Sequence, residues 1–447
     1  MIFITKLIAR IFYICLVFKK SVMKKLRIVI LIILGVISAN IQAQELDVNL
    51  QIRPRYEYRN GYKTLIPYGK EATSQISQRS RLNFNYKQDE LTVKLTFQNT
   101  RTWGDVAPTA PADKNGVAVF EAWAQYDFTK KWSARIGRQV LSYDNQRILG
   151  EQDWGTQAQS HDALTVSFHP ENHQLDLGVA YNSDAENTFQ TPYTVANYKA
   201  MQYAWYHTTC DKIGASLLLL NTGYEFTRNP AATPVKLLVD YKQTFGTYLT
   251  YKTTKIDSNL SLYGQTGKST DQQVSAWNAA VNFGYNITDS FKAGLGYEFL
   301  SGKDTNDGSK VIKSFNPIFG TNHAFNGYMD YFYVGGGHLN NVGLQDAFLK
   351  LNYNVNKWQF ALIPHVFLSA ADVVTAENVK LDSYLGTEID ATFGYNFKKD
   401  IVVSGGYSQM FGSETLEFIK SPGVANHTNN WAWLMISVNP RIFSWKK

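Results

Sequence analysis

The chain has 447 residues, of which 44% are hydrophobic and 14% are aromatic, and its formal net charge is +7. This length fits two or three soluble domains or one large barrel. The positive charge does not indicate a nucleic-acid-binding protein, because seven basic residues and no acidic residue lie in residues 1–43. The remaining 37 basic residues balance 37 acidic residues, and no basic run with interleaved aromatics is left.

Residues 1–43 have the pattern of a secretory leader. The basic segment Lys24–Arg27 precedes the apolar run Ile28–Ile37, which is too short to cross a bilayer as a helix. We therefore predict a signal peptide, whose true start is Met23 if the segment before it is a mis-assigned extension. An N-terminal anchor in that extension is the alternative. Residues 44–447 are expected to form one domain.

The segments after the leader alternate apolar and polar residues over about 10–13 positions, the length of a transmembrane β-strand. Ile76–Tyr86 and Ser275–Asn286 show this alternation, as does Tyr384–Asn396. In the last of these, Leu385 and Ile389 are expected on the lipid face, and the intervening polar residues on the lumen face. Strands of soluble sandwiches are usually shorter. The sequence therefore predicts an all-β fold, a single transmembrane antiparallel β-barrel.

Taken in chain order, the alternation predicts 18 strands, with 16 as the alternative because the pair around 212–253 is the least regular. The predicted strands span residues 46–58, 76–87, 91–102, 117–128, 132–142, 161–169, 173–183, 199–208, 212–224, 240–253, 257–267, 273–286, 290–302, 343–355, 358–368, 384–396, 400–411 and 429–438. The last strand should end before Pro440, which lacks the backbone donor that a strand ladder needs.

The predicted connections alternate between short turns and long loops. The long loops span residues 59–75, 103–116, 143–160, 184–198, 303–342 and 369–383. Outer-membrane barrels have short periplasmic turns and long outer loops, so both ends of this barrel are expected on the periplasmic side. Tryptophans near the predicted strand ends suit interfacial girdles in contact with outer-membrane lipid. We therefore predict a location in the bacterial outer membrane.

Residues for catalysis or metal binding do not occur in recognisable patterns. After the leader, the only cysteine is Cys210, which excludes an intrachain disulfide and a cysteine-based metal site. The eight histidines have no metal-ligand spacing such as HExxH, and no nucleophile elbow, P-loop or dinucleotide fingerprint occurs. We predict no metal site, no cofactor and no enzymatic activity. A barrel enzyme such as a lipase or protease is the third hypothesis.

Charged residues on the predicted lumen faces form the candidate site. The basic candidates are Arg53, Arg55, Arg79, Arg81, Lys94 and Arg135. The acidic candidates are Glu121, Glu298, Asp346, Glu388 and Asp390. Arginine suits carboxylate recognition because its planar guanidinium donates two hydrogen bonds to one carboxylate. These charges either line a polar channel with a basic ladder on one wall, or pair across the lumen and plug it.

Three stretches resemble the alginate-export family of outer-membrane barrels. Residues 137–150 read GRQVLSYDNQRILG and are followed by Asp153-Trp154, which matches the family's pattern at a strand end. Residues 315–323 read FNPIFGTNH and are similar to the family's long loop, and GLQDA at 343–347 opens the next strand. The resemblance covers essentially the whole mature chain. It implies an 18-stranded monomeric barrel whose arginine-lined constriction lets a polyanionic polysaccharide cross the outer membrane.

The resemblance adds Arg138 and Arg147 to the candidates for anion binding in the lumen. Arg138 falls on the apolar phase of its strand unless a bulge intervenes. The mature chain has no net charge, unlike a protein with a strongly cationic pore. This difference concerns the prediction of the substrate and not the prediction of the barrel. Periplasmic secretion proteins are implied partners, and nucleic acid is not expected.

Our leading hypothesis is a passive channel for an anionic polysaccharide, such as a polyuronate, or for small anionic sugars. The alternatives are a general porin and a plugged barrel with an adhesive or structural role. In the plugged barrel, residues 303–342 would be the contact loop.

Overall fold

The computed structural model describes residues 45–447 except 230, 232–234, 334–341 and 422. The predicted signal peptide and the alternative start at Met23 lie outside the described residues. Within the described residues, nineteen β-strands form one antiparallel sheet, and one α-helix and one 3-10 helix lie in its loops.

The first nine strands are β1 (Glu45–Asn60), β2 (Thr73–Gln88), β3 (Leu91–Thr102), β4 (Ala118–Asp127), β5 (Trp132–Gln139), β6 (His161–Phe168), β7 (His173–Tyr181), β8 (Ala200–Cys210) and β9 (Ile213–Phe226). The others are β10 (Leu238–Lys252), β11 (Ile256–Ser269), β12 (Gln272–Asn286), β13 (Phe291–Leu300), β14 (Leu344–Val355), β15 (Trp358–Leu368), β16 (Tyr384–Lys398), β17 (Ile401–Gly412), β18 (Thr428–Val438) and β19 (Arg441–Lys446). The helices are η1 (Asn322–Ala324) and α2 (Glu414–Lys420). No helix in the described residues is long and apolar enough to cross a membrane.

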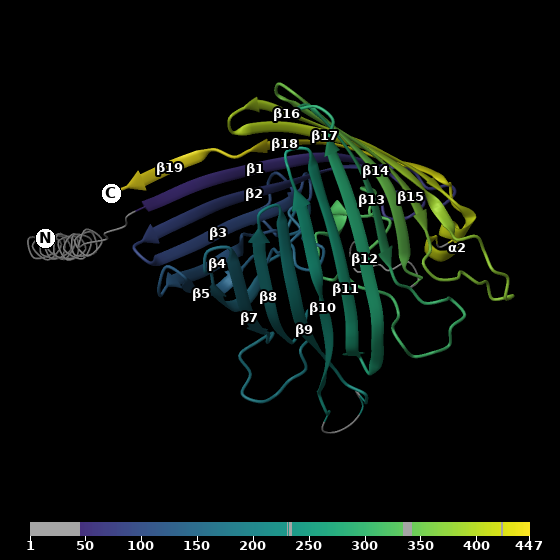
Figure 1. Cartoon of the computed structure of the whole chain (residues 1–447), viewed down its shortest axis with the longest axis horizontal. Helices are drawn as coiled ribbons and strands as arrows, with labels where there is room; N and C mark the ends of the chain where they lie inside the picture. The colour runs from purple at the N-terminus through teal and green to yellow at the C-terminus, as the bar shows by residue number, and fades with distance from the viewer. Residues whose placement is uncertain (1–44, 230, 232–234, 334–341, 422) are drawn as a thin grey trace, which may run out of the picture.

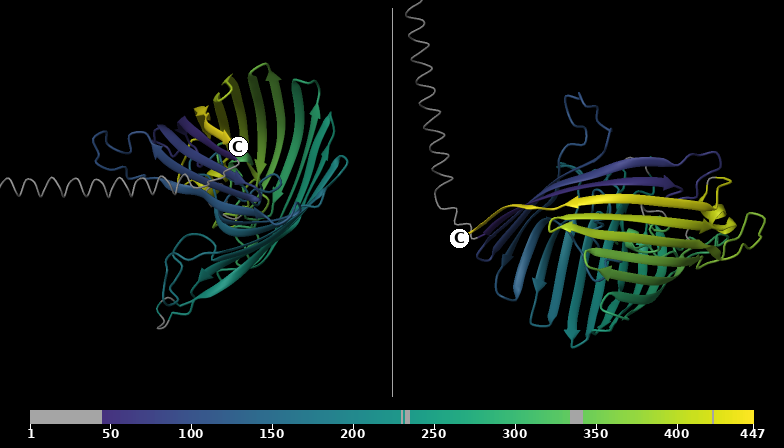
Figure 2. Two further views of the ribbon diagram at one scale, coloured as in Figure 1. Left: turned by 90° about the vertical axis from the view of Figure 1, so that its left-hand side faces the viewer. Right: turned by 90° about the horizontal axis from the view of Figure 1, so that it is seen from above.

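The sheet closes on itself, because β1 pairs with β2 on one side and with both β18 and β19 on the other. β18 and β19 form one strand that Pro440 interrupts. Val438 lies opposite Ile52, and Arg441 lies opposite Asn49. Figure 1 shows β19 beside β1, and Figure 2 shows the barrel from two further sides. The prediction of an 18-stranded barrel is confirmed, and β18 ends at Val438 as predicted, but the sequence analysis did not predict that pairing with β1 resumes after Pro440 in β19.

The ladder continues beyond the proline because the carbonyl of Pro440 still accepts a hydrogen bond. The N–H of Leu50 donates to it at 3.0 Å. Proline removes only the donor of the pair, so one missing hydrogen bond interrupts the strand without ending it.

Short turns join the strands at the end of the barrel where β1 begins and β19 ends. Several are two-residue turns in which the first residue has a positive φ, as at Asp89, Asp211 and Asn356. Asp and Asn tolerate this conformation better than other residues with a side chain. Long loops lie at the opposite end, except for the two-residue connection between β11 and β12. The short-turn end is therefore the periplasmic end.

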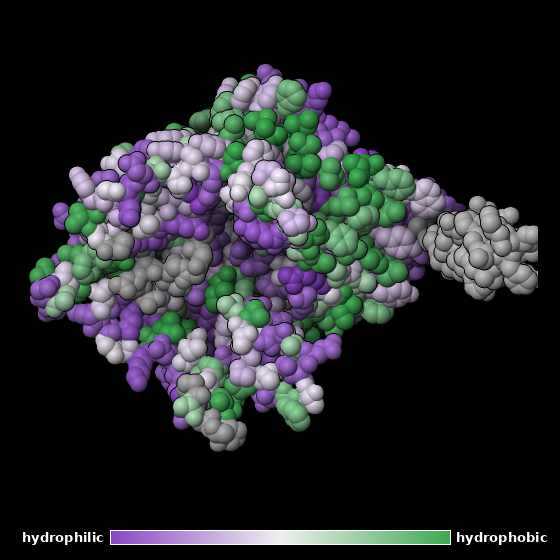
Figure 3. All heavy atoms as spheres, turned by 180° about the vertical axis from the view of Figure 1, so that it is seen from behind, coloured by the Kyte–Doolittle hydropathy of each residue, from purple (hydrophilic) through white to green (hydrophobic). Residues whose placement is uncertain are grey.

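Large hydrophobic side chains project from the outer face of the strands. On β12, Trp277 and Phe283 are about half exposed, whereas Asn278 between them is 1% exposed and faces the interior. Figure 3 shows hydrophobic side chains gathered on the outer surface beside a hollow lined by hydrophilic residues. This surface suits contact with lipid chains, because the outward-facing side chains of a transmembrane barrel lie in the hydrocarbon of the bilayer and not in water.

The alternation has one exception in β16. Ile389 faces outward as expected, but Leu385 is fully buried inside the barrel. The register with β15 shifts between Phe367 and Leu368, so the pairing skips Leu385, and Gly386 has a φ of +154°. Such a bulge adds one residue to a strand and reverses the faces beyond it. The prediction that Leu385 faces lipid is therefore wrong.

Candidate functional site inside the barrel

Two long loops fold into the interior of the barrel. They are residues 140–160 between β5 and β6, the β5–β6 loop, and the described part of residues 301–343 between β13 and β14, the β13–β14 loop. The loops touch through a bridge between Leu149 and Phe319. The N–H of Gly150 also donates to the carbonyl of Phe319 at 2.9 Å. Together they narrow the lumen from the outer side.

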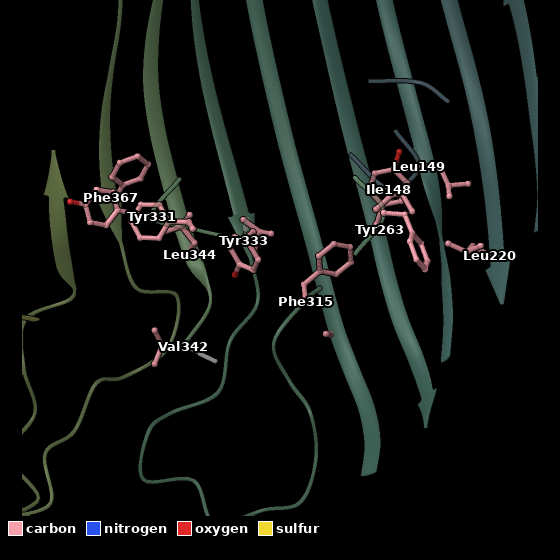
Figure 4. Close-up of a cluster of buried hydrophobic side chains, with 14 of the residues drawn as sticks. Ile148, Leu149, Leu220, Tyr263, Phe315, Tyr331, Tyr333, Val342, Leu344 and Phe367 are labelled. Atoms are coloured by element: carbon pink, nitrogen blue, oxygen red, sulfur yellow. The ribbon is translucent and has the colours of Figure 1, made fainter. Parts of the chain in front are cut away.

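Apolar side chains of these loops form the core inside the barrel. Leu149 and Phe315 are almost fully buried, and they belong to the same cluster as Tyr263 and Leu220 of the barrel wall. Figure 4 shows Leu149 beside Tyr263 and Leu220 against the strands. Each such burial contributes roughly 1.5–3 kcal/mol. The loops are thus packed against the wall by ordinary hydrophobic contact.

Three predicted arginines converge on one carboxylate of the β5–β6 loop. Arg53 and Arg79 lie directly opposite each other on β1 and β2, a destabilising position for two like charges. Asp153 lies between their guanidinium groups. One carboxylate oxygen is 3.0 Å from Arg53 Nη1, and the other is 2.7 Å from Arg79 Nη2 and 3.5 Å from Arg81 Nη1. This carboxylate therefore offsets repulsion within the basic wall.

Backbone carbonyls at the tip of the loop complete this arrangement. Arg53 Nη2 donates to the carbonyl of Asp153 at 2.8 Å, and Arg55 Nη1 donates to that of Trp154 at 2.8 Å. The Arg79 side chain is fully buried, but the Asp153 side chain remains 43% exposed. The carboxylate is therefore reachable from the lumen, whereas the arginine behind it is covered as long as the loop tip stays in place.

Arg55 has a second carboxylate partner. Its Nε lies 3.2 Å from Glu57, a buried residue that also accepts from Trp431 Nε1 at 3.2 Å. The Arg55 guanidinium lies over the ring of Trp154, 4.1 Å from its centroid. Arg55 therefore supports the loop through both charge and stacking.

Two predicted cations lie on the wall away from the loop tip. Lys94 pairs with Glu121 at 2.5 Å. Arg135 donates two hydrogen bonds to Gln125, at 3.0 and 2.8 Å, and lies over the ring of Trp123. Arg135 has no carboxylate partner in the described part of the chain. Its positive charge thus faces the lumen unbalanced.

Arg147 links the two loops to the opposite wall. Its Nε and Nη2 donate to the two carboxylate oxygens of Glu298 on β13, at 2.8 and 3.0 Å. Nη2 also donates to Asn326 at 2.8 Å. Both partners of the ion pair are almost fully buried. A buried pair with this bidentate geometry leaves Arg147 no freedom to contact a solute.

The predicted acidic residues hold the β13–β14 loop. Glu388 accepts from the N–H of Met329 at 2.8 Å, and Asp390 accepts from that of Tyr328 at 3.2 Å. Gly327 has a φ of +83°, and a Cβ there would lie 2.7 Å from the Glu388 carboxyl. This close approach requires glycine.

Asp346 extends the same contact. It accepts from Asn326 of the loop at 3.2 Å and contacts His365 at 2.9 Å. The predicted charges of the two walls therefore do not pair across an empty lumen. The basic wall binds the β5–β6 loop, and the acidic wall binds the β13–β14 loop and, through Glu298, Arg147 of the β5–β6 loop.

The prediction that Arg138 lines the lumen is wrong. Its neighbours Arg135 and Gln139 face inward, while Ile136 is 63% exposed on the outer face. The alternation of β5 continues without a bulge, so Arg138 also points outward, where it pairs with Asp162 at 2.9 Å.

Two important groups were absent from the predicted site. Asp153 and Trp154 were noted only as part of the family pattern, although they form the tip that contacts the basic wall. No local signal reveals this, because the contact joins residues about 100 positions apart. Lys292 and Lys350, which line the periplasmic mouth, could have been found by extending the lumen phase of β13 and β14.

A water-accessible cavity of about 880 Å³ lies at the periplasmic end of the lumen. Its closed end consists of Trp154, His323 and Tyr328 from the two loops, and Lys350 and Trp433 are part of its wall. The Trp154 and His323 rings stack with centroids 4.4 Å apart. This periplasmic vestibule therefore ends directly below the arginine contact with the β5–β6 loop.

Comparisons with known proteins agree with this architecture. A family model described as alginate export matches residues 44–413. Comparison with curated protein sequences gave no match. Among solved structures, OccAB4 of Acinetobacter baumannii has a TM-score of 0.61 at 12% identity, covering 90% of this chain and 99% of that one.

Two Pseudomonas aeruginosa structures are also similar. OccK11 (OpdR) has a TM-score of 0.58 at 11% identity and covers 89% of this chain and 96% of that one. OpdK, solved with vanillate, has a TM-score of 0.57 at 12% identity and covers 90% and 99%. At these identities the likeness concerns the fold, and the match of the family model over most of the chain establishes membership. The chain therefore belongs to the alginate export family and is a β-barrel channel of the bacterial outer membrane.

Proposed function

We propose that this channel passes carboxylate-bearing saccharides, either a polyuronate or smaller anionic sugars. The observation that carries the proposal is the convergence of Arg53, Arg79 and Arg81 on the single carboxylate of Asp153. A protein carboxylate already occupies this position, where it accepts a hydrogen bond from Arg53 and forms ion pairs with Arg79 and Arg81. The same guanidinium groups therefore suit the carboxylate of a uronate.

The charge balance at this position supports an anionic solute. Three guanidinium groups surround one carboxylate, which leaves a net charge of +2 among these four side chains. Walls of low dielectric concentrate the field of such charges in the lumen and raise the local concentration of anions. A general porin would have no such preference.

A closed barrel with a structural role is the second candidate. The observation that favours it is the packing of both loops in the lumen, where Leu149 and Phe315 are almost fully buried. The contacts of the loop tip with the basic wall are nevertheless polar and partly exposed, so a solute can compete for them. Conductance separates the two candidates.

The test is single-channel conductance of the purified full-length protein in a planar bilayer under a salt gradient, with oligouronates added. We expect steady conductance, a reversal potential that indicates anion preference, and block by oligouronates. Arg79→Gln should weaken the block about tenfold, the effect of losing about 1.4 kcal/mol of binding. Arg138→Gln is the matched control, because Arg138 lies on the outer face.

Each result has a clear meaning. Conductance without anion preference or block would replace the proposal with a general porin. No conductance from a correctly folded barrel would favour the closed barrel. Equal effects of the two substitutions would show that block does not occur at the basic wall.

A further inference from the structure

The periplasmic vestibule contains a lysine that no carboxylate of the described residues approaches within ion-pair distance. Lys350 lies on β14 in the same phase as Phe348, whose ring centroid is 5.1 Å from that of His365 inside the barrel. Lys350 therefore faces the lumen, and its side chain is exposed there. In the described part of the chain it forms no hydrogen bond and no ion pair.

The neighbouring lysine behaves differently. Lys292 of β13 is directed to Asp257 of β11, with Nζ 2.6 Å from the carboxylate. Gly294 and Lys350 lie opposite each other in the ladder, which places the two lysines diagonally on one face. The vestibule thus has one ammonium group in an ion pair and one that forms no ion pair within the described residues.

Aromatic rings lie at the closed end of the same cavity. Trp433 packs edge-on against Trp154, with ring centroids 4.9 Å apart, and Tyr328 stacks on His323 at 5.5 Å. The position of Trp433 depends on Gly406, where a Cβ would lie 2.4 Å from the indole nitrogen. Aromatic rings offer rigid apolar surface together with polar edges, a combination that suits the faces of sugar rings.

Neutral polar groups line the same cavity on the periplasmic side of the lysine. Asn352 of β14 and Gln359 of β15 line the cavity, and no side-chain hydrogen bond occupies either of them in the described structure. Their amides provide donors and acceptors for hydroxyl groups. The cavity volume, about 880 Å³, lies within the usual range of small-molecule sites, about 300–1,000 Å³.

We infer that the periplasmic vestibule is a binding site for an acidic sugar residue, in which Lys350 pairs with the carboxylate and the aromatic closed end contacts the sugar ring. This inference rests on the proposed function, because it names a second site for the same class of solute. The amides of Asn352 and Gln359 bind the hydroxyl groups.

The charge of the vestibule favours a singly charged sugar unit over a densely charged anion. Its lining includes Lys292 and Lys350 against Asp257 and Asp289, so these four charges sum to zero. A phosphate, with about two negative charges, would meet Lys350 as the one lysine of this lining that is not already in an ion pair within the described residues. A uronate unit brings one carboxylate and several hydroxyls, which this set of groups matches.

The experiment measures binding of an oligouronate trimer and of a neutral trisaccharide to the full-length protein in detergent, by isothermal titration calorimetry. Lys350→Met should weaken binding of the uronate trimer about tenfold and leave binding of the neutral trisaccharide unchanged. Lys350→Arg should restore binding of the uronate trimer. The matched control is Lys357→Met, which removes an exposed lysine from the turn after β14, outside the vestibule. The heat-dependent gel mobility of folded barrels verifies that each variant is folded.

A parallel measurement with Arg79→Gln separates this inference from the proposed function. Loss of trimer affinity in Lys350→Met, with the binding site retained in Arg79→Gln, supports the vestibule site. Unchanged affinity in Lys350→Met, with loss only in Arg79→Gln, overturns the vestibule site and leaves the proposed function standing. No trimer binding to the unsubstituted protein overturns both. Equal weakening by Lys350→Met and Lys357→Met also overturns the inference, because it indicates a general charge effect.

Discussion

Substitution of Asp153 by asparagine tests whether the β5–β6 loop is held by its charge. The substitution keeps the size of the side chain and removes the carboxylate that contacts Arg53, Arg79 and Arg81. The net charge of this group of side chains then rises from +2 to +3. The backbone carbonyls of the loop tip still accept from the arginines, so the loop loses only part of its attachment.

The size of the effect follows from the exposure of Asp153. Two unit charges 4 Å apart attract by about 4 kcal/mol at an effective dielectric constant of 20. The Asp153 side chain is 43% exposed, and exposed ion pairs contribute only about 0–1 kcal/mol each. Three such pairs therefore contribute about 1–2 kcal/mol in total. Their loss should make displacement of the loop tip about tenfold more frequent.

Single-channel recording measures this directly. We expect Asp153→Asn to show more frequent transitions to a higher conductance and a stronger preference for anions. Glu186→Gln is the control, because it removes an exposed negative charge from the loop between β7 and β8, and Glu186 forms no salt bridge in the described part of the chain. If Asp153→Asn and Glu186→Gln behave alike, or if anion preference falls in Asp153→Asn, the reasoning about the loop is refuted.

Three further predictions concern the attachment of the loops. Arg147→Met leaves Glu298 buried without its partner and should destabilise the two loops by about 3–5 kcal/mol. The measurement is hydrogen exchange, which should become faster in residues 140–160. Adding Glu298→Gln should recover part of the protection, and no recovery would contradict a direct pair. Gly327→Ala forces a side chain into the Glu388 contact and should expose the β13–β14 loop to protease without unfolding the barrel, so unchanged proteolysis would contradict the close approach. Burial lowers the pKa of Lys420 in the folded protein to about 8. Between pH 8 and the ordinary pKa of lysine, the unfolded chain therefore binds more protons than the folded protein. The free energy of unfolding should rise with pH across this window. Lys420→Met should therefore raise the melting temperature at pH 7 but have little effect near pH 10, and an equal gain at both values would show that charge is not the cause.

The periodicity of the sequence was sufficient for the barrel. Alternation with a period of two reports which residues of a strand share a face, and each strand carries this information locally. Asn278 and Trp277 accordingly face opposite sides of β12. The same rule placed Arg138 on the outer face, and the rule was correct where the family resemblance suggested a lumen position.

The alternation of apolar and polar residues did not predict two places where the pairing between strands is irregular. The bulge in β16 turns Leu385 inward, and Pro440 interrupts the last strand without ending it. Both depend on the hydrogen bonds of a neighbouring strand. The apolar and polar pattern of one strand contains no information about how that strand aligns with its neighbour in the sheet.

The sequence by itself determined that this protein is a barrel, favoured 18 strands over 16, and indicated which face of most strands meets lipid. Only the tertiary structure decided what the charged residues of the interior do. Arg53 and Asp153 are separated by 100 residues, and Arg147 and Glu298 by 151. No periodic signal connects such pairs, because they meet only when the barrel is closed and its loops fold inward. The inward fold of the loops turns a predicted basic ladder into a contact with a carboxylate of the chain itself, and it creates the vestibule below that contact.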